Sequence, residues 1–261
     1  MATDTKRRES DRSSEGCDRI PALRNGDHLS ADEFMRRYQA MPHLKKAELI
    51  EGRVYVPSPD SDLAEWKQAS MSSPVSYEGH CSPHFYLAGW FFLFAAATPG
   101  VRGGVDGTVL LDLKNRPQPD GFLFIEPRAG GQVRYSPDDY IDGAPDLVAE
   151  VAYSTASVDM HEKLQAYERN AAREYLVWRV EDRSIDWFVL RENRYQPLEK
   201  ATDGIFRSEV LPGLWLDPEA LLDGSLTRFN AVAQQGLASP EHAAFVEKLR
   251  QNAAEIAGAK S

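Results

Sequence analysis

The stretch that decides the fold runs from Asp146-Leu-Val-Ala-Glu-Val151 to Glu174-Tyr-Leu-Val-Trp-Arg-Val180. Each of these two segments is a short apolar run bounded by polar or turn-forming residues, which predicts two strands. Between them, residues 159–171 carry apolar side chains at helical spacing, which predicts a helix. A strand, a helix and a second strand in this order predict two parallel strands joined by a right-handed crossover.

Further strands are predicted on both sides of this unit. Residues 107–113 and 120–125 precede it and residues 185–190 follow it, each as a short apolar run. Residues 195–198 and 205–210 are weaker strand candidates. Strands that follow one another so closely predict antiparallel neighbours. The predicted fold class is therefore α/β, a mixed β-sheet flanked by helices.

The N-terminal part of the chain predicts a helix and a hairpin. Ser30 and Glu33 have the spacing of a capping box, at the start of a helix predicted over residues 30–40. Residues 47–56 have the pattern of a strand or a hairpin with its turn at Gly52.

Three more helices are predicted further along. Residues 84–97 are apolar nearly all round, yet too few to span a membrane, which predicts a buried helix. Short helical patterns also occur around residues 218–222 and 240–250.

The domain organisation is predicted from changes in composition. Residues 1–28 have almost no apolar periodicity, which predicts a disordered or loosely attached tail. Residues 57–79 are rich in Ser and Pro and are typical of an insertion or an extended loop. We expect an αβ domain over residues 29–222 and a C-terminal helical extension over residues 223–261.

Composition excludes several classes of protein. The 261 residues carry a net charge of −10, so there is no global basic field of the kind that draws proteins onto nucleic acid without specificity. Cys17 and Cys81 are the only cysteines, and two isolated cysteines form neither a disulfide framework nor a zinc spacing. The sequence predicts no membrane span and no secretory signal, so the predicted location is cytoplasmic.

Lys163 is the first charged residue that needs an explanation. Asp159 as the N-cap and Glu162 three residues later predict that the helix begins just before Lys163. Lys163 then lies at the margin of the apolar stripe that contains Leu164 and Tyr167. A lysine there either extends along apolar surface to water or meets a carboxylate.

Two acidic residues on neighbouring segments raise the same question. Strand alternation places Asp146, Val148 and Glu150 on one face, and a glutamate within a central strand is costly to bury uncompensated. Glu150 is therefore either part of an ion pair at a strand end or part of a functional site. Asp120 follows Pro119 at the start of its predicted strand, where it is either a turn residue or a site residue.

Considered together, Asp120, Glu150 and Lys163 have the composition of a metal-dependent hydrolytic site. Carboxylate oxygens suit Mg²⁺ or Mn²⁺, and these ions keep waters and bridge to substrate phosphates. A nearby lysine can stabilise developing charge or orient the attacking water. The three residues are therefore candidates for metal-assisted phosphodiester cleavage.

Several segments, in order, resemble the Uma-two type restriction-endonuclease-like family of the PD-(D/E)XK nuclease superfamily. The resemblance covers about residues 28–220. Its segments are Ala47-Glu-Leu-Ile-Glu-Gly-Arg-Val54, Gln118-Pro-Asp-Gly121, Ala144-Pro-Asp-Leu-Val-Ala-Glu-Val151, Glu162-Lys-Leu-Gln-Ala-Tyr167, Arg173-Glu-Tyr-Leu-Val-Trp178 and Leu211-Pro-Gly-Leu-Trp-Leu216.

The resemblance implies a restriction-endonuclease-like core with a divalent-metal site for Mg²⁺ or Mn²⁺. It implies that Asp120 and Glu150 are metal ligands, that Lys163 is the catalytic lysine, and that Glu48 is an auxiliary ligand or orienting residue. The superfamily's usual lysine lies two residues after the Glu, where this chain has Ala152. Lys163 would therefore have to reach the carboxylates from the helix.

Two interpretations of function follow. The first is an endonuclease that hydrolyses DNA through metal-activated water, and the second is an inactive nuclease-fold protein that serves as a binding or regulatory module. A glycosidase is also conceivable from paired carboxylates, but it leaves Lys163 unexplained. His84, or His80, either faces the site or is structural. The tryptophan-rich strands over 174–190 either form a homodimer surface or pack in the core.

Overall fold

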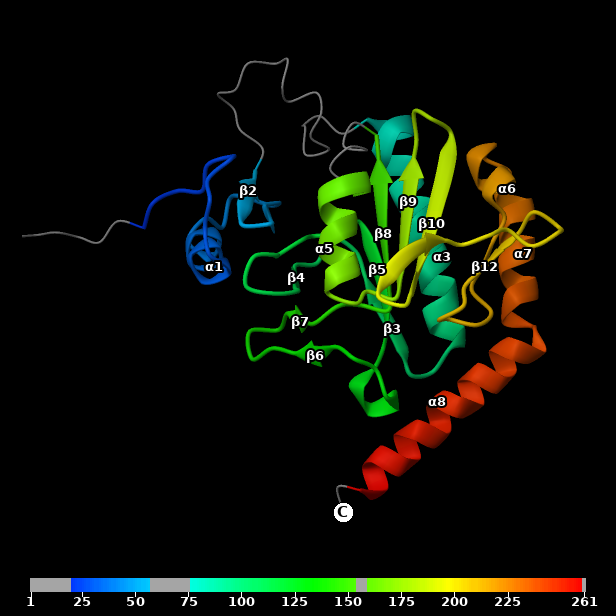
Figure 1. Cartoon of the computed structure of the whole chain (residues 1–261). Coiled ribbons are helices and arrows are strands. Elements are labelled where there is room, and N and C mark those ends of the chain that lie inside the picture. Colours follow the sequence, from blue (N-terminus) through cyan, green and yellow to red (C-terminus); the bar gives the residue numbers. More distant parts are fainter. Residues whose placement is uncertain (1–19, 57–75, 154–158, 260–261) are drawn as a thin grey trace, which may run out of the picture.

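A six-stranded mixed sheet forms the centre of the computed structural model, which describes residues 20–56, 76–153 and 159–259 (Figure 1). In spatial order its strands are β11 (Arg194–Pro197), β10 (Ser184–Arg191), β9 (Glu174–Arg179), β8 (Leu147–Ala152), β5 (Gly121–Ile125) and β3 (Val101–Gly104). β8 and β9 run parallel, whereas the other neighbouring pairs are antiparallel. The parallel pair and the mixed sheet are both confirmed.

The segment that crosses from β8 to β9 covers one face of the sheet. Its described part consists of a π-helical turn, η3 (Asp159–Lys163), and the helix α5 (Leu164–Arg169). The helix is shorter than predicted because Ala171 adopts a positive φ of 60°, a conformation that does not continue a helix. Tyr167 of α5 packs on Tyr175 of β9, with ring centroids 5.1 Å apart.

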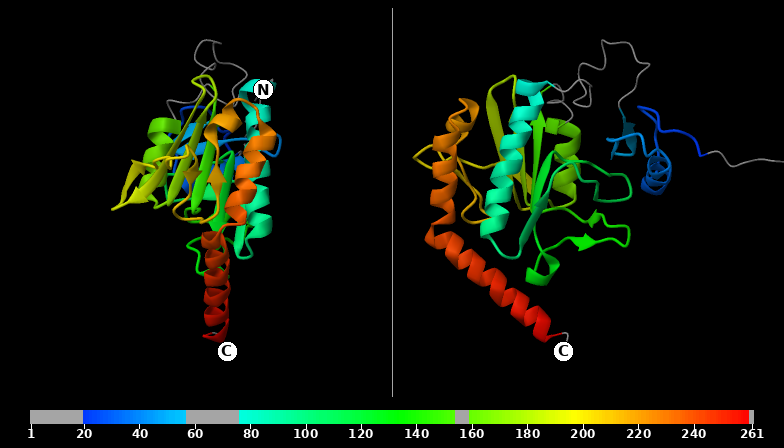
Figure 2. Two further views of the ribbon diagram at one scale, coloured as in Figure 1. Left: turned by 90° about the vertical axis from the view of Figure 1, so that its right-hand side faces the viewer. Right: turned by 180° about the vertical axis from the view of Figure 1, so that it is seen from behind.

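The opposite face is covered by α3 (Ser82–Ala97), α6 (Pro218–Leu222) and α7 (Leu226–Leu237), as Figure 2 shows. Trp90 of α3 packs against Trp187 of β10 and Phe229 of α7. The rings of Trp178 and Trp187 are buried in this core, so the tryptophan-rich strands pack inward. The sequence predicted α6 but not α7.

The prediction that residues 84–97 form a helix is confirmed, but the prediction that it is buried is wrong for one side. Phe85 and Phe92 are 70% and 72% exposed, whereas Trp90 and Phe94 are buried. A helix that lies on one face of a sheet can bury only a stripe of its surface, even where all its side chains are apolar.

The N-terminal helix and hairpin form as predicted. In α1 (Ala31–Gln39) the Ser30 hydroxyl caps the helix by accepting from the Glu33 amide at 3.3 Å. β1 (Glu48–Ile50) and β2 (Arg53–Tyr55) pair antiparallel around a turn at Gly52, which has a positive φ of 78°. Leu49 exchanges two backbone hydrogen bonds with Arg116, at 2.7 and 3.2 Å. This exchange attaches the hairpin to the segment that leads into β5.

The strand predicted over residues 107–113 is shorter than predicted, and it pairs parallel where antiparallel neighbours were expected. Only β4 (Val109–Leu110) forms, and it pairs with β7 (Ile141–Asp142) in a small sheet that includes β6 (Arg134–Tyr135). Asp106 with a positive φ of 53° turns the chain before it, and the Asp112 carboxylate accepts from the Lys114 amide to form a turn after it. β3 was not predicted at all.

The C-terminal part adds a second pair of short strands and a long helix. β12 (Phe206–Arg207) pairs with β13 (Trp215–Leu216), and α8 (Pro240–Gly258) packs against η2 (Pro127–Ala129). α8 is longer than the predicted pattern at 240–250. The division into residues 1–28, 29–222 and 223–261 stays a prediction, and Cys17 and most of the 57–79 segment lie outside the described residues. Within the described part, no helix is both long and apolar enough to cross a membrane.

Candidate functional site

The centre of the candidate site is an ion pair between β8 and the crossover segment. Lys163 ends η3, and its Nζ lies 3.1 Å from Glu150 Oε1 on β8. The hydroxyl of Tyr167 donates to the same oxygen at 3.3 Å. Lys163 is only 4% exposed, so it does not extend to water. The lysine therefore contacts the strand glutamate from the helical segment.

Glu48 joins this pair from the N-terminal hairpin. Its Oε1 lies 3.1 Å from Lys163 Nζ and accepts the backbone N–H of Gln118 at 2.7 Å. The Gln118 side chain in turn accepts the Ala47 N–H at 3.2 Å. Tyr55 of β2 also donates a hydrogen bond to Glu162, next to Lys163. These contacts hold β1 and β2 against the sheet edge and direct a buried carboxylate at Lys163.

Asp120 lies immediately before β5, beside Glu150. Gly121 pairs with Ala149 in the antiparallel register, so Asp120 and Glu150 are the next residues outward on the two strands. Asp120 Oδ2 accepts the backbone N–H of Val151 at 2.8 Å, and the side chain is buried. The four residues singled out in the sequence, Glu48, Asp120, Glu150 and Lys163, therefore lie together at one edge of the sheet.

A second lysine, which sequence reasoning missed, lies at the same edge. Lys46 precedes β1, and its Nζ lies 3.3 Å from Asp120 Oδ1. A signal for it was present, because period-two alternation places Lys46 and Glu48 on the same side of an extended segment. Nothing local, however, predicts its partner, which is 74 residues away along the chain.

The electrostatics of the site favour the ionised forms. Burial by itself would raise the pKa of Asp120, but Lys46, His80, Lys163 and the Val151 N–H outweigh it, so the pKa lies below its usual range. Burial by itself would lower the pKa of Lys46, but Asp120 and the other nearby carboxylates raise it above its usual value. Asp120 is therefore a carboxylate and Lys46 an ammonium at neutral pH.

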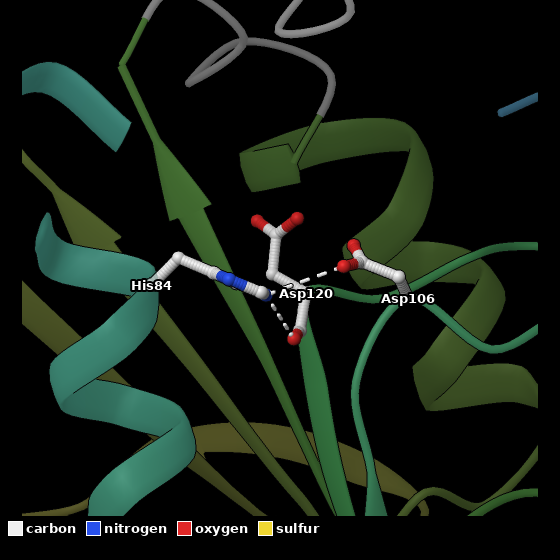
Figure 3. A group of neighbouring side chains, drawn as sticks. All are labelled: His84, Asp106 and Asp120. Atoms are coloured by element: carbon white, nitrogen blue, oxygen red, sulfur yellow. Dashed lines mark hydrogen bonds and ion pairs between the residues drawn. The ribbon is translucent and has the colours of Figure 1, made fainter. Parts of the chain in front are cut away.

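Two histidines approach Asp120 from the other side. Figure 3 shows the His84 side chain of α3 pointing toward Asp120 and Asp106. One nitrogen of His84, one carboxylate oxygen of Asp106 and one of Asp120 lie within 4.8 Å of one another. His84 Nε2 lies 2.8 Å from the backbone oxygen of Asp120 and 3.7 Å from Asp106 Oδ2. His80, on η1 (Tyr77–Cys81), stacks on His84, and its Nε2 lies 3.9 Å from Asp120 Oδ1. Both histidines thus face the site.

Asp106 was also missed by sequence reasoning. Its only signal is the dipeptide Asp106-Gly107, which is typical of a turn, and the residue does adopt a positive φ of 53°. Its approach to His84 depends on how the loop after β3 returns to β5, where the Asp106 N–H donates to the Pro119 oxygen at 3.1 Å.

One group of side chains among the described residues has its ligand atoms close enough together to hold a metal: His84, Asp106 and Asp120, which offer an imidazole nitrogen and two carboxylate oxygens. Glu150 and Glu48, which the family resemblance implies as further ligands, lie at the same sheet edge and offer oxygens of the kind that suits Mg²⁺ or Mn²⁺. A nitrogen 2.8 Å from a carbonyl oxygen must carry the proton, because the carbonyl can only accept. His84 Nε2 is therefore a hydrogen-bond donor here and would have to lose that proton to bind a metal.

Comparison with known proteins agrees with this architecture. The crystal structure described as "a putative nuclease belonging to DUF820" from Anabaena variabilis superposes with a TM-score of 0.52, over 75% of this chain and 98% of that chain, at 13% sequence identity. At this identity the likeness shows the fold, which is restriction-endonuclease-like. Among curated proteins, none matches this chain. The family described as "Uma2: Putative restriction endonuclease" matches residues 31–219. The chain therefore belongs to the Uma2 family.

Proposed function

We propose that this protein is a divalent-metal-dependent endonuclease that hydrolyses phosphodiester bonds of DNA. The observation that carries the proposal is the meeting of Glu48, Asp120, Glu150 and Lys163 at one sheet edge, all of them buried. Family and fold support the same class of activity. Burial of four charged groups is costly unless the charges are compensated by one another or by a bound ligand.

The donor set fits a divalent cation. Among the described residues, the contacts of this cluster include three carboxylates, Glu48, Asp120 and Glu150, and two ammonium groups, Lys46 and Lys163. One negative charge is thus in excess, and oxygen atoms predominate. Hard cations such as Mg²⁺ and Mn²⁺ prefer these ligands. Asp120 and Glu150 would hold the ion, with Glu48 as an auxiliary ligand or as the group that orients Lys163.

Each side chain has a role that follows from its contacts. When bound, the cation would lower the pKa of a water and offset negative charge that develops on the phosphate. Lys163 would orient the attacking water or stabilise that developing charge. Glu48 would keep Lys163 in place through its 3.1 Å contact. The water oxygen would form the new bond to phosphorus while its proton passes to solvent. The bond from phosphorus to the leaving oxygen would break, and that oxygen would take a proton from solvent.

A second candidate function is an inactive nuclease-fold module that binds or regulates a partner. The net charge of −10 favours it, because a strongly acidic protein approaches a polyanion less readily. In that case the carboxylate and lysine cluster serves only to join the hairpin to the sheet.

Nicking of supercoiled plasmid DNA distinguishes the two functions. We expect Mn²⁺- or Mg²⁺-dependent nicking that a chelator abolishes and that Glu150→Gln lowers at least about 100-fold. Glu174→Gln is the matched control, since Glu174 is equally buried at the other end of the neighbouring strand, and it should retain nicking. No cleavage with any divalent metal would contradict the endonuclease proposal, and equal loss in both variants would contradict the site.

A further inference from the structure

Lys46 is the second lysine of the candidate site, and it contacts Asp120. Its Nζ lies 3.3 Å from Oδ1 of Asp120, one of the carboxylates of the candidate site. The lysine is not on a helix or strand but in the connection between α1 and β1. Its side chain is 22% exposed, compared with 5% for Lys163. Lys46 is therefore the lysine of the site that borders solvent.

The two oxygens of Asp120 have different partners. Oδ2 accepts the N–H of Val151 within the sheet, at 2.8 Å, and this contact is fixed by the backbone. Oδ1 faces the two cationic or polar side chains Lys46 and His80, at 3.3 and 3.9 Å. A metal ion that binds Asp120 through Oδ1 leaves the contact between Oδ2 and the Val151 N–H undisturbed. It then meets the ammonium group of Lys46 at the same oxygen.

We propose that Lys46 is a substrate-binding lysine that gives up Asp120 Oδ1 to the metal and then binds the scissile phosphate. The proposal rests on the proposed metal-dependent nuclease function. Two cations that share one carboxylate oxygen repel each other, so metal binding favours movement of the lysine. A lysine side chain has a flexible four-carbon stem and carries a compact charge, which suits such a movement. Once displaced from Asp120, the ammonium group would bind a negatively charged non-bridging oxygen of the phosphodiester.

The charges of the site support this exchange. Three carboxylates and two ammonium groups leave one negative charge in excess without metal. A divalent cation brings the sum to +1, and one phosphodiester brings it to 0. Without Lys46 the metal-loaded site would be neutral before the substrate arrives. Lys46 therefore weakens metal binding and supplies the positive charge that attracts the phosphate.

The test is Lys46→Met, with Lys45→Met as the matched control. Lys45 is the adjacent residue and is exposed, so its substitution removes the same net charge from the chain without altering Asp120. Calorimetric titration of the DNA-free protein with Mn²⁺ should show at least tenfold tighter binding for Lys46→Met than for wild type or Lys45→Met. Cleavage of a duplex oligonucleotide at saturating Mn²⁺ should show KM raised about tenfold, and Lys46→Arg should restore KM.

The two measurements together separate this role from a structural one. Removal of an ammonium group beside Asp120 favours Mn²⁺ binding whatever the role of the lysine, so an unchanged KM for Lys46→Met overturns the proposal even where Mn²⁺ binding tightens. Unchanged or weaker Mn²⁺ binding by Lys46→Met overturns it as well. Circular dichroism verifies folding, and Lys46→Gln replaces Lys46→Met if the latter does not fold. If the wild type binds Mn²⁺ and cleaves DNA but Lys46→Met binds Mn²⁺ with unchanged affinity, only the Lys46 proposal is wrong. A wild type that neither binds Mn²⁺ nor cleaves DNA defeats the proposed function as well.

Discussion

The two ends of the parallel pair β8 and β9 both bury acidic side chains, yet they compensate them differently. At one end, Glu150 meets the ammonium group of Lys163, and the neighbouring Asp120 meets that of Lys46. At the other end, Asp146, just before β8, and Glu174, the first residue of β9, are fully buried, and the Glu174 N–H donates to the backbone oxygen of Asp146 at 2.9 Å. We call these the site end and the anchor end.

At the anchor end, the buried carboxylates are compensated mainly by neutral hydrogen-bond donors. Glu174 accepts the hydroxyl of Ser208 at 2.7 Å and the backbone N–H groups of Glu209 and Val210 at 2.8 and 3.2 Å. Asp146 accepts the N–H of Ile125 at 2.7 Å. The backbone N–H groups among these donors are fixed by the fold and cannot be exchanged for another cation. They hold the loop before β13 and the end of β5 onto the sheet.

The difference shows which buried acids can exchange partners. Burial raises the pKa of Glu174 to about 7 and also raises that of Asp146, because neutral donors and one partly exposed arginine only partly offset it. At the site end, lysines keep the pKa of Asp120 below its usual range. A side-chain ammonium can be replaced by a metal ion, whereas a backbone N–H cannot. Burial alone therefore does not identify a functional carboxylate.

The largest expected effect separates the two ends by activity. Asp120→Asn keeps an acceptor for the Val151 N–H but removes the charge, so we expect metal-dependent plasmid nicking to fall by about 1000-fold. Asp146→Asn is the matched change at the anchor end and should retain nicking per folded molecule. Equal losses of nicking in the two variants would contradict the assignment of the functional site to one end only.

The next effect separates them by stability. Glu174→Ala leaves the Glu209 and Val210 N–H groups and the Ser208 hydroxyl without their acceptor, so we expect the free energy of unfolding to fall by about 3 kcal/mol. Urea denaturation followed by tryptophan fluorescence measures this. A loss below about 1 kcal/mol would show that these donors find water and that the anchor end is not structural.

The pH dependence of stability sharpens the same contrast. The pKa of Glu174 rises from 4.5 in the unfolded chain to about 7 when folded, so the folded state binds its proton more tightly. That stability is complete below pH 4.5 and is lost as the pH rises to about 7, by up to about 3 kcal/mol. Glu174→Gln should not show this decline, so the difference in unfolding free energy between the wild type and the variant should change between pH 4.5 and about 7. Parallel profiles would contradict the assigned pKa.

The smallest effect concerns the arginine of the anchor end. Arg173 lies 2.8 Å from Asp146 Oδ1, but its side chain is 41% exposed, so solvent screens the pair. We expect Arg173→Met to lower the free energy of unfolding by only about 1 kcal/mol at neutral pH, measured by thermal melting. A loss comparable with that of Glu174→Ala would mean that the ion pair, rather than the neutral donors, compensates the anchor end.

Much of the fold follows from local patterns in the sequence. Alternation and apolar runs indicate β8, β9, β5 and β10, and the capping pattern at Ser30 and the turn at Gly52 place the first helix and the hairpin. These features depend on residues a few positions apart, which the sequence displays directly. The shortened strand at β4 and the missed β3 depend instead on which segment lies alongside, and no local pattern encodes that.

The site divides in the same way. The sequence by itself determined that Asp120, Glu150 and Lys163 carry charges where the surrounding segments are apolar, and family resemblance added Glu48. Only the tertiary structure decided that Lys163 is buried between Glu48 and Glu150, that Lys46 meets Asp120, and that Asp106 approaches His84. The physical reason is that a buried charge must be compensated, whereas the partner that compensates it is chosen by strand register and by loops that return over tens of residues.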